Sequence, residues 1–292
     1  VFFSEDQQLS LDRIKQITAE AAILGAEILE LAGGEPMTRG GIYEIISHAR
    51  SVGLDVLMVT NGVLIGALET KQLIEAGITA VSISLEGPEP VNDHIRGRGN
   101  YQKALGAICN FLRSKTKQPN LKVTVGITLS RYNYRLIVPF AKYLLEEIGV
   151  DEITVNPFTP DMLMGENRKP RLQEFNITAD SIPDLIAEMN QLREYALTVP
   201  DKLPSPGFLS EIPEYFLGKK LVPTGGCQIP SLYCGITANG LIHPCWKYPP
   251  IGDLNRSSLR EIWGSKNHQE FINRAVARQC KGCLLSCYPE NH

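Results

Sequence analysis

The stretch Ala80-Val81-Ser82-Ile83-Ser84-Leu85-Glu86-Gly87 decides the fold that this sequence predicts. Its apolar residues suit a short buried strand, and its last residues are polar or small. A helical stretch that ends at Gly77 precedes it, and another spans residues 101–115. A strand between two helices is the unit from which parallel, helix-covered sheets are built.

The alternation of helix and strand can be followed five times through the first 158 residues. Ser10 can cap the first helix, and Gly25 can end it. The further helices are expected at 42–52, in a stretch reaching Ala76, at 101–115 and at 135–148, and the strands at 28–31, 55–59, 80–85, 123–129 and 152–155. Such strands predict a parallel sheet, either a barrel or a doubly wound sheet. Because the series opens on a helix, we expect a first strand before Val1.

The composition is that of an ordinary globular protein. The chain has 292 residues, of which 43% are hydrophobic and 21% charged, and its net charge is −3. This charge balance gives no strong field for nucleic acid, and no run of about 18 apolar residues could form a membrane span. The chain starts without Met and without a secretory signal, so we expect a cytoplasmic protein whose true start lies upstream.

We expect three regions along the chain. Residues 1–158 hold the helix–strand series, 159–206 form a connecting segment with one helix near 182–197, and 207–292 form a cysteine-rich domain. In this last region, Ile236-Thr237-Ala238-Asn239-Gly240-Leu241-Ile242 predicts a β-hairpin, since Asn-Gly favours a tight turn between apolar pairs. Short helices at 258–263 and 269–277 are expected to follow.

Small or polar residues follow each predicted strand, at the edge where parallel α/β folds bind their ligands. In Gly33-Gly34-Glu35-Pro36 the glycines would let backbone approach a ligand, and the carboxylate suits a cationic amine. Thr60-Asn61-Gly62 follows the next strand. Ser84 and Arg96 could together hold a carboxylate, because arginine offers paired donors. Taken singly, each motif also fits an ordinary turn or a surface ion pair.

Six of the seven cysteines fall between Cys227 and Cys287. Thiols crowded into one part of so long a chain indicate a metal or cluster site rather than disulfide staples. Cys227 and Cys245 flank the hairpin, and Cys280-x-x-Cys283 follows on a return segment. Four such thiolates suit a 4Fe-4S cluster or a tetrahedral Zn²⁺ ion, and the single C-x-x-C favours iron and sulfur.

The remaining candidate ligands rank lower. Cys234 and Cys287 are surplus or alternative ligands, and His243 comes after the cysteines because a thiolate set is already available. Cys109 lies alone upstream, in a predicted helix, where a buried and inert thiol is expected.

These motifs together resemble those of the radical S-adenosylmethionine (SAM) superfamily. The resemblance rests on residues 33–36, 60–62 and 82–87 and on Asp93-x-x-Arg96-Gly97. The C-terminal run resembles the superfamily's SPASM/twitch extension, through Cys227-x12-Gly240-x4-Cys245, residues 250–254, Leu259-x-Glu261-Ile262-Trp263 and the last cysteines. The resemblance implies an α/β fold, a partial (β/α)6 TIM-like barrel, followed by a small cysteine-rich domain of β-hairpin plus helix.

The resemblance also implies an activity. Such an enzyme reductively cleaves SAM to a 5′-deoxyadenosyl radical and modifies a peptide, or else a small-molecule substrate, by hydrogen abstraction. It takes electrons from a donor such as a flavodoxin or ferredoxin. By analogy, residues 33–35 receive the methionyl amine of SAM, Ser84 and Arg96 its carboxylate, and residues 156–158 lie near the adenosine. The implied cofactor-binding set is Gly33, Gly34, Glu35, Pro36, Asn61, Ser84, Glu86, Arg96, Asn156 and Phe158.

Two iron–sulfur clusters are implied. The preferred ligands of an auxiliary 4Fe-4S cluster are Cys227, Cys245, Cys280 and Cys283, and Cys234 or Cys287 could replace one of them. The superfamily holds its SAM cluster through C-x3-C-x2-C, a motif that these 292 residues do not contain, so we expect it upstream of Val1. Two other functions stay open: a zinc-stabilised, non-catalytic ligand-binding protein, and a degenerate partner that binds SAM without cleaving it.

Overall fold

A curved parallel sheet forms the centre of the molecule. The computed structural model describes residues 8–160 and 173–285. Five strands pair in chain order, each parallel to the next: β1 (Ile28–Leu31), β2 (Asp55–Thr60), β3 (Ala80–Ser84), β4 (Lys122–Leu129) and β5 (Glu152–Pro157). In a doubly wound sheet, the order in which strands are added reverses once, so that the spatial order differs from the chain order. The sequential order therefore selects the barrel-type arrangement, and the expected partial barrel is confirmed.

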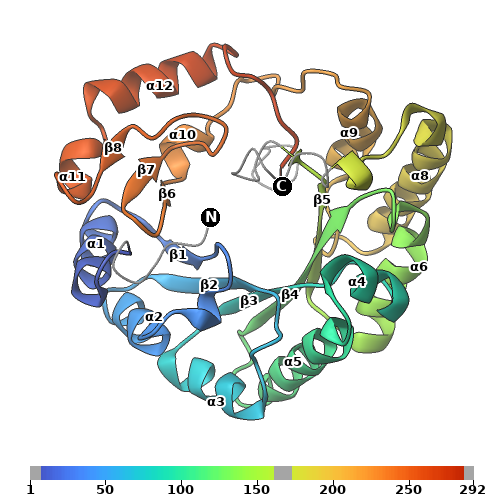
Figure 1. The fold of residues 1–292 in the computed structure, drawn as a ribbon, viewed down its shortest axis with the longest axis horizontal. Coiled ribbons are helices and arrows are strands. Elements are labelled where there is room, and N and C mark those ends of the chain that lie inside the picture. The colour runs from blue at the N-terminus through green and yellow to red at the C-terminus, as the bar shows by residue number, and fades with distance from the viewer. Residues whose placement is uncertain (1–7, 161–172, 286–292) are drawn as a thin grey trace.

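Helices cover the outside of the arc of strands (Figure 1). They are α1 (Leu11–Ile23), α2 (Ile42–Ser51), α3 (Ala67–Ala76), α4 (Glu89–Arg96), α5 (Asn100–Ser114), α6 (Ile137–Lys142), α8 (Ile182–Thr198) and α9 (Pro206–Phe216). Ser10 caps α1 as predicted, by accepting a hydrogen bond from the Arg13 N–H. Gly77 ends α3 in the left-handed conformation, which glycine adopts without steric cost.

The strands alternate between two chemically different faces. Val56, Val81, Val125 and Ile153 are fully buried and belong to one large core with the helices. Because side chains alternate along a strand, the residues between them point to the concave side of the arc. These include Glu30, Ser82, Ser84, Gly126, Thr154 and Asn156, as the strand register shows. The concave face therefore carries these polar groups beside Leu57 and Val59, whereas the helix side is mainly aliphatic.

Two differences from the predicted elements have a local cause. The connection after β3 holds the additional helix α4, which begins after Pro88 and lacks the apolar repeat that periodicity detects. The single helix expected at 135–148 is irregular, because α6 passes into a π-helical turn at Tyr143–Ile148 before Gly149 ends it. Wide turns of this kind are short insertions into an α-helix.

The C-terminal region is small and built as expected around a hairpin. β6 (Gly235–Ile236) and β7 (Leu241–His243) pair antiparallel, and β8 (Gly252–Asp253) adds a third strand. The helices are α10 (Ile229–Leu232), α11 (Leu259–Ile262) and α12 (Lys266–Val276). This region lies across the open side of the strand arc (Figure 1).

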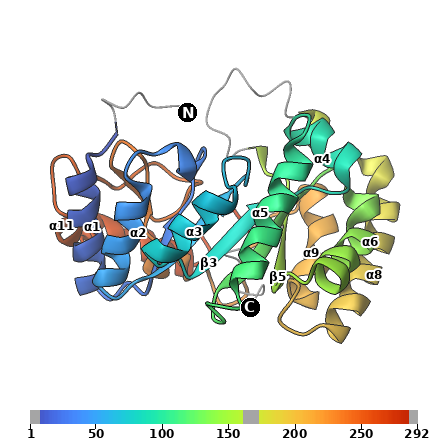
Figure 2. The same ribbon diagram turned by 90° about the horizontal axis from the view of Figure 1, so that it is seen from below.

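The first helix joins the C-terminal region to the barrel. The Arg13 guanidinium donates to the carbonyls of Leu254 and Ser257, and Glu20 accepts from the Leu259 N–H at 2.7 Å. A second apolar cluster forms between them, made of Leu9, Ile17, Ile242, Leu254, Leu259 and Ile262. Figure 2 shows α1 beside α11 at one end of the molecule, and α8 with α9 at the other.

The division at residue 206 stays a prediction. Phe208, Leu209 and Ile212 of α9 are fully buried in the main core, so the packing of the barrel continues past that point. No helix in the described part of the chain is both long enough and apolar enough to cross a membrane.

Candidate functional site

Glu35 joins the loops that follow the first two strands. Its Oε1 accepts hydrogen bonds from the Thr60 hydroxyl at 2.7 Å and from the Met37 N–H at 3.2 Å. Its Oε2 accepts from the Asn61 N–H at 2.9 Å. A carboxylate has about four acceptor positions, and the described residues occupy three of them. The carboxylate therefore fixes the loops and can still accept from a ligand.

The backbone before Glu35 is open. Gly33 has a φ of +126°, and a Cβ atom at either Gly33 or Gly34 would meet nothing within 4 Å. Both residues are exposed, whereas Pro36 is buried and begins a short 3-10 turn. These two peptides have space for a ligand beside them, as the sequence predicts for a close backbone approach.

The side chain of Asn61 closes its own turn. Its Oδ1 accepts from the Val63 N–H at 2.8 Å, a local bond of the kind that Asn makes in turns. This side-chain oxygen therefore has the role that an ordinary turn would give it. The contribution of Asn61 at the site edge comes from its backbone N–H on Glu35.

Glu86 and Arg96 form a buried ion pair. The Glu86 side chain is 2% exposed and that of Arg96 is 26% exposed. Glu86 Oε1 accepts from Arg96 Nε at 2.9 Å, and Oε2 accepts from the Thr128 N–H at 2.6 Å. The guanidinium uses Nε and Nη2 on Glu86, and its Nη1 has no hydrogen-bond partner among the described residues. The expected use of Arg96 with Ser84 stays a prediction.

Two buried asparagines, which the sequence analysis did not single out, complete this network. Asn92 Oδ1 accepts from the Glu86 N–H at 2.9 Å, and Asn133 Nδ2 donates to the Glu86 carbonyl at 2.8 Å. Asn92 is fully buried and Asn133 is 2% exposed. Buried amides of this kind hold a loop in place, and the Ser-x-x-Asn pattern at Ser130 after β4 was the available signal.

Ser84 and Asn156 both face the concave side near the carboxyl ends of their strands. Ser84 is in register with Gly126, and Asn156 is in register with Thr128, two residues further along β4. The Oδ1 atom of Asn156 is buried and has no hydrogen-bond partner among the described residues. Because buried polar atoms are nearly always satisfied, this orphaned acceptor fits a site that binds a ligand with N–H or O–H donors.

Phe158 belongs to a row of rings just after β5. It is 8% exposed and stacks on Phe175, with 5.3 Å between ring centroids and 29° between planes. Phe175 meets Tyr132 edge-on at 5.4 Å, and Tyr132 meets His94 at 4.8 Å. Apolar faces at a strand end can pack against a planar group.

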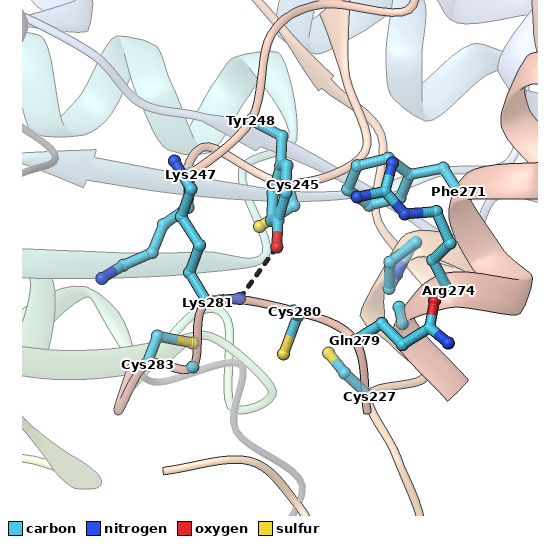
Figure 3. Close-up of a pocket in the computed structure, with 13 residues that line it drawn as sticks. Cys227, Cys245, Lys247, Tyr248, Phe271, Arg274, Gln279, Cys280, Lys281 and Cys283 are labelled. Carbon is cyan, nitrogen blue, oxygen red and sulfur yellow. Dashed lines mark hydrogen bonds between the residues drawn. The ribbon is translucent and has the colours of Figure 1, made fainter. Parts of the chain in front are cut away.

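Four cysteines line one cavity in the C-terminal region (Figure 3). Cys227, Cys245, Cys280 and Cys283 come from the loop before α10, the turn after β7 and the segment after α12. The cavity is also bordered by Lys247, Tyr248, Phe271, Arg274 and Lys281. The structure thus brings together the four ligands that we prefer from the sequence.

Two glycines explain how these loops come so close. A Cβ on Gly226 would lie 2.2 Å from the carbonyl oxygen of Val276, and one on Gly282 would lie 2.8 Å from that of Leu221. Both residues also have a positive φ. Any side chain would therefore separate the cysteine loops from the segments that position them.

Burial raises the pKa of the Cys227 and Cys245 thiols. The neighbouring thiol of Cys280 adds to the rise in both cases, and N–H donors from Ile229 and Lys247 act against it. Metal binding requires deprotonated thiols, so a metal bound here would displace their protons. Four thiols that line one cavity are the donor set that a 4Fe-4S cluster uses.

Four thiolates are also a donor set for one tetrahedral zinc ion. In the described ranges, no three His, Cys, Asp or Glu side chains are grouped closely enough to hold a single ion as they stand.

The other cysteines lie elsewhere. Cys234 packs against the second apolar cluster, and burial raises its pKa to about 12. It does not line the cavity, so we leave it out of the ligand set that we propose. Cys287 lies outside the described residues. Cys109 is a half-buried residue of α5. His243 Nδ1 donates to the Tyr248 carbonyl at 3.1 Å, and its ring stacks on Trp246.

Comparison with known proteins gives the class. Residues 2–144 match the radical SAM superfamily, and residues 227–284 match an iron–sulfur cluster-binding domain, SPASM. The chain belongs to the radical SAM superfamily and carries a C-terminal SPASM domain, so it is a member of an enzyme family whose cofactors are SAM and iron–sulfur clusters. The predicted family is confirmed, and the zinc-stabilised binding protein is not supported.

The relatives of this chain have names that describe different activities. The chain is 31% identical to a PqqA peptide cyclase of Xanthomonas campestris pv. campestris (strain B100), over 92% of this chain and 69% of that protein. It is 27% identical to an Fe-coproporphyrin III synthase of Methanosarcina barkeri, over 95% and 73%. The solved structure of anSMEcpe with bound AdoMet and Cp18Cys peptide shares the fold, with a TM-score of 0.67, 16% identity, and coverage of 94% and 80%.

Proposed function

We propose that this protein binds SAM at the carboxyl ends of its barrel strands, cleaves it reductively and modifies a peptide substrate. The observation that supports this most is the joint placement of two sites. Glu35, with an open backbone before it and two neighbouring loops fixed around it, lies at the strand ends. Four cysteines line a separate cavity in the domain that closes the arc.

The residues toward SAM have distinct tasks in this proposal. Gly33, Gly34 and Glu35 present carbonyls and a carboxylate to the methionyl amine. Nη1 of Arg96, held in position by Glu86, and the hydroxyl of Ser84 receive the methionyl carboxylate. Pro36 and Asn61 shape the loops, and Asn156 and Phe158 provide an unpaired acceptor and a ring face for the adenosine.

When bound, SAM and a reduced 4Fe-4S cluster supply a 5′-deoxyadenosyl radical that removes a hydrogen atom from the substrate. The protein positions the groups and keeps water away. The SAM-cluster motif C-x3-C-x2-C does not occur in these 292 residues, and its place upstream of Val1 stays a prediction. We propose Cys227, Cys245, Cys280 and Cys283 as ligands of the auxiliary cluster.

A peptide is the favoured substrate for two reasons. The relative with 31% identity is named as a peptide cyclase, and the structure with the same fold contains a peptide. The electron donor that we propose is a carrier such as a flavodoxin or ferredoxin. We place the protein in the cytoplasm because reducing conditions keep these thiols available for iron.

The test has two parts. SAM binding is measured on the 292-residue chain by anaerobic calorimetry, with Glu35→Gln as a weakened variant. SAM cleavage is measured as 5′-deoxyadenosine after adding dithionite to protein expressed with the upstream coding region restored. Binding with cleavage supports the proposal. Binding without cleavage in the extended protein would establish the degenerate SAM-binding partner instead.

A further inference from the structure

Glu30 is a charged residue of the barrel interior that the proposed SAM site does not use. It lies at the third position of β1, in register with Leu57 of β2. Its neighbours Leu29 and Leu31 pack against the main core on the helix side. Glu30 therefore points to the concave face, because adjacent side chains of a strand point to opposite faces.

The carboxylate of Glu30 has no charged or hydrogen-bonding partner among the described residues. No hydrogen bond or ion pair joins it to any other residue within 8–160 and 173–285. The other charged residues of this face lie at the opposite ends of the strands and are paired: Asp55 with Arg50, and Lys122 with Glu152. Glu30 is thus the one unpaired charge that the described strands present to the barrel interior.

Solvent reaches the Glu30 side chain, but the carboxylate is partly desolvated. The side chain is exposed to solvent, and yet the surrounding protein desolvates the carboxylate and raises its pKa. Both observations hold for a group inside a concave surface that water can enter. Such a carboxylate gains more from a cationic partner than one on an open surface does, because the local dielectric is lower.

The distance along the strand suits a substrate group. Glu30 precedes Gly33 by three residues, which is about 10 Å of extended chain. The hydroxyls of Ser82 and Ser84 and the amide of Asn156 lie on the same concave face. A substrate whose reacting carbon is at the strand ends could therefore extend a side chain down to Glu30.

We propose that Glu30 is a specificity-determining residue that binds a cationic side chain of the substrate, a lysine or an arginine. The inference rests on the proposed function, since it places a peptide in the barrel interior. It also separates two substrate classes represented among the relatives' names. An unpaired carboxylate attracts a cationic peptide, whereas it repels a porphyrin that carries several carboxylates.

The experiment uses the SAM-loaded, anaerobically reconstituted protein and a randomised peptide library of equal residue composition. Captured peptides are sequenced by mass spectrometry. We expect wild type to enrich Lys and Arg over the input, and Glu30→Gln to lose about tenfold in affinity for a captured cationic peptide, as expected for a lost charge-assisted bond. Glu30→Lys should shift the enrichment to Asp and Glu.

Glu27→Gln is the matched control, because Glu27 is an exposed carboxylate three residues upstream, outside the strand. It should enrich the same peptides as wild type, and circular dichroism shows that each variant is folded. Two results would overturn the role of Glu30 and leave the peptide proposal standing. One is that the captured peptides are not enriched in Lys and Arg, and the other is that Glu30→Gln captures the same peptides with the same affinity. Capture of no peptide, together with tight binding of coproporphyrin III, would overturn the peptide proposal as well.

Discussion

The Thr60 hydroxyl donates to Glu35 Oε1 across 2.7 Å, and this bond ties the loop after β2 to the loop after β1. Thr60 is 3% exposed, so water cannot replace the bond without rearrangement. The same carboxylate holds the Asn61 N–H through its other oxygen. The shape of the strand-end site therefore depends on one side chain that also faces the ligand.

We expect Thr60→Val to weaken SAM binding without removing the Glu35 charge. The variant keeps the volume and removes both the donor to Glu35 and the acceptor of the Gly62 N–H at 3.1 Å. Each lost hydrogen bond costs about 1 kcal/mol of stability. Calorimetry should show a SAM affinity lowered by about five- to tenfold. Thr38→Val is a control, because the Thr38 hydroxyl bonds only to the backbone carbonyl of Glu35. Equal losses in both variants would show that general loosening of the loop, rather than the position of the carboxylate, sets the affinity.

Arg96→Leu should destabilise the fold more than a surface ion pair would suggest. The variant leaves the Glu86 carboxylate, 2% exposed, without its cationic partner. Loss of one partner from a buried charge pair costs about 2–5 kcal/mol, and we expect the lower half of that range because Arg96 itself is partly exposed. Urea unfolding measures the change.

The double variant Arg96→Leu/Glu86→Gln separates charge from packing. Since the neutral amide needs no cation, it should recover more than half of the lost stability. If the double variant is as unstable as Arg96→Leu, the packing of the Arg96 side chain is what matters.

The helix–strand series could be predicted because its signals are local. Apolar periodicity and glycine stops lie within each segment, as Gly77 shows at the end of α3. α4 was missed because a short polar helix after Pro88 has no apolar stripe of its own. α9 was not predicted as part of the barrel, because the prolines before it, Pro204 and Pro206, suggest a linker. In the structure, Phe208 of α9 packs into the core.

The sequence predicts which residues form the site, but only some of the contacts between them. Strand ends meet at one edge, so Glu35 and Thr60 were expected near each other. Sequence spacing does not show which side chain a guanidinium will choose, and Arg96 pairs with Glu86. In the same way, spacing left Cys234 as an alternative ligand, and only the packing shows that it lies against the second apolar cluster.

Alanine at any of the four cavity cysteines should lower the iron content. We expect about four irons and four sulfides per chain for this domain in wild type, and fewer than one in Cys245→Ala after anaerobic reconstitution. Cys234→Ala and Cys109→Ala are the matched controls and should retain the iron, because neither lines the cavity. Iron lost in Cys234→Ala but kept in Cys283→Ala would reassign the fourth ligand.

Gly282→Ala should reduce cluster assembly even though it removes no ligand. Its Cβ would lie 2.8 Å from the Leu221 carbonyl oxygen, and overpacking of this kind costs about 1–3 kcal/mol. Gly264→Ala is the control, because Gly264 has a similar φ of +85° and nothing within 4 Å. Iron per chain and absorbance near 400 nm should fall in Gly282→Ala only. Equal losses in both would attribute the effect to backbone strain rather than to the position of the Cys280–Cys283 loop.

Glu30→Gln should stabilise the protein at neutral pH and have no effect in acid. Burial raises the pKa of Glu30 in the folded chain, and no cation in the described part of the chain compensates. A raised carboxyl pKa means that the folded state holds its proton more tightly than the unfolded state does. The associated stability is therefore complete below the unfolded value, near pH 4, and is lost as the pH rises through the folded value. Above that window wild type carries the cost of the unpaired charge, and Glu30→Gln does not.

Solvent reaches the Glu30 side chain, so the gain in stability should be modest, about 0.5 kcal/mol. Thermal unfolding from pH 4 to 8 measures it, with Glu27→Gln as the flat reference. A gain that grows toward low pH would mean that the carboxylate is stabilised by a partner in the folded chain, and Glu30 would then not be available to a cationic substrate.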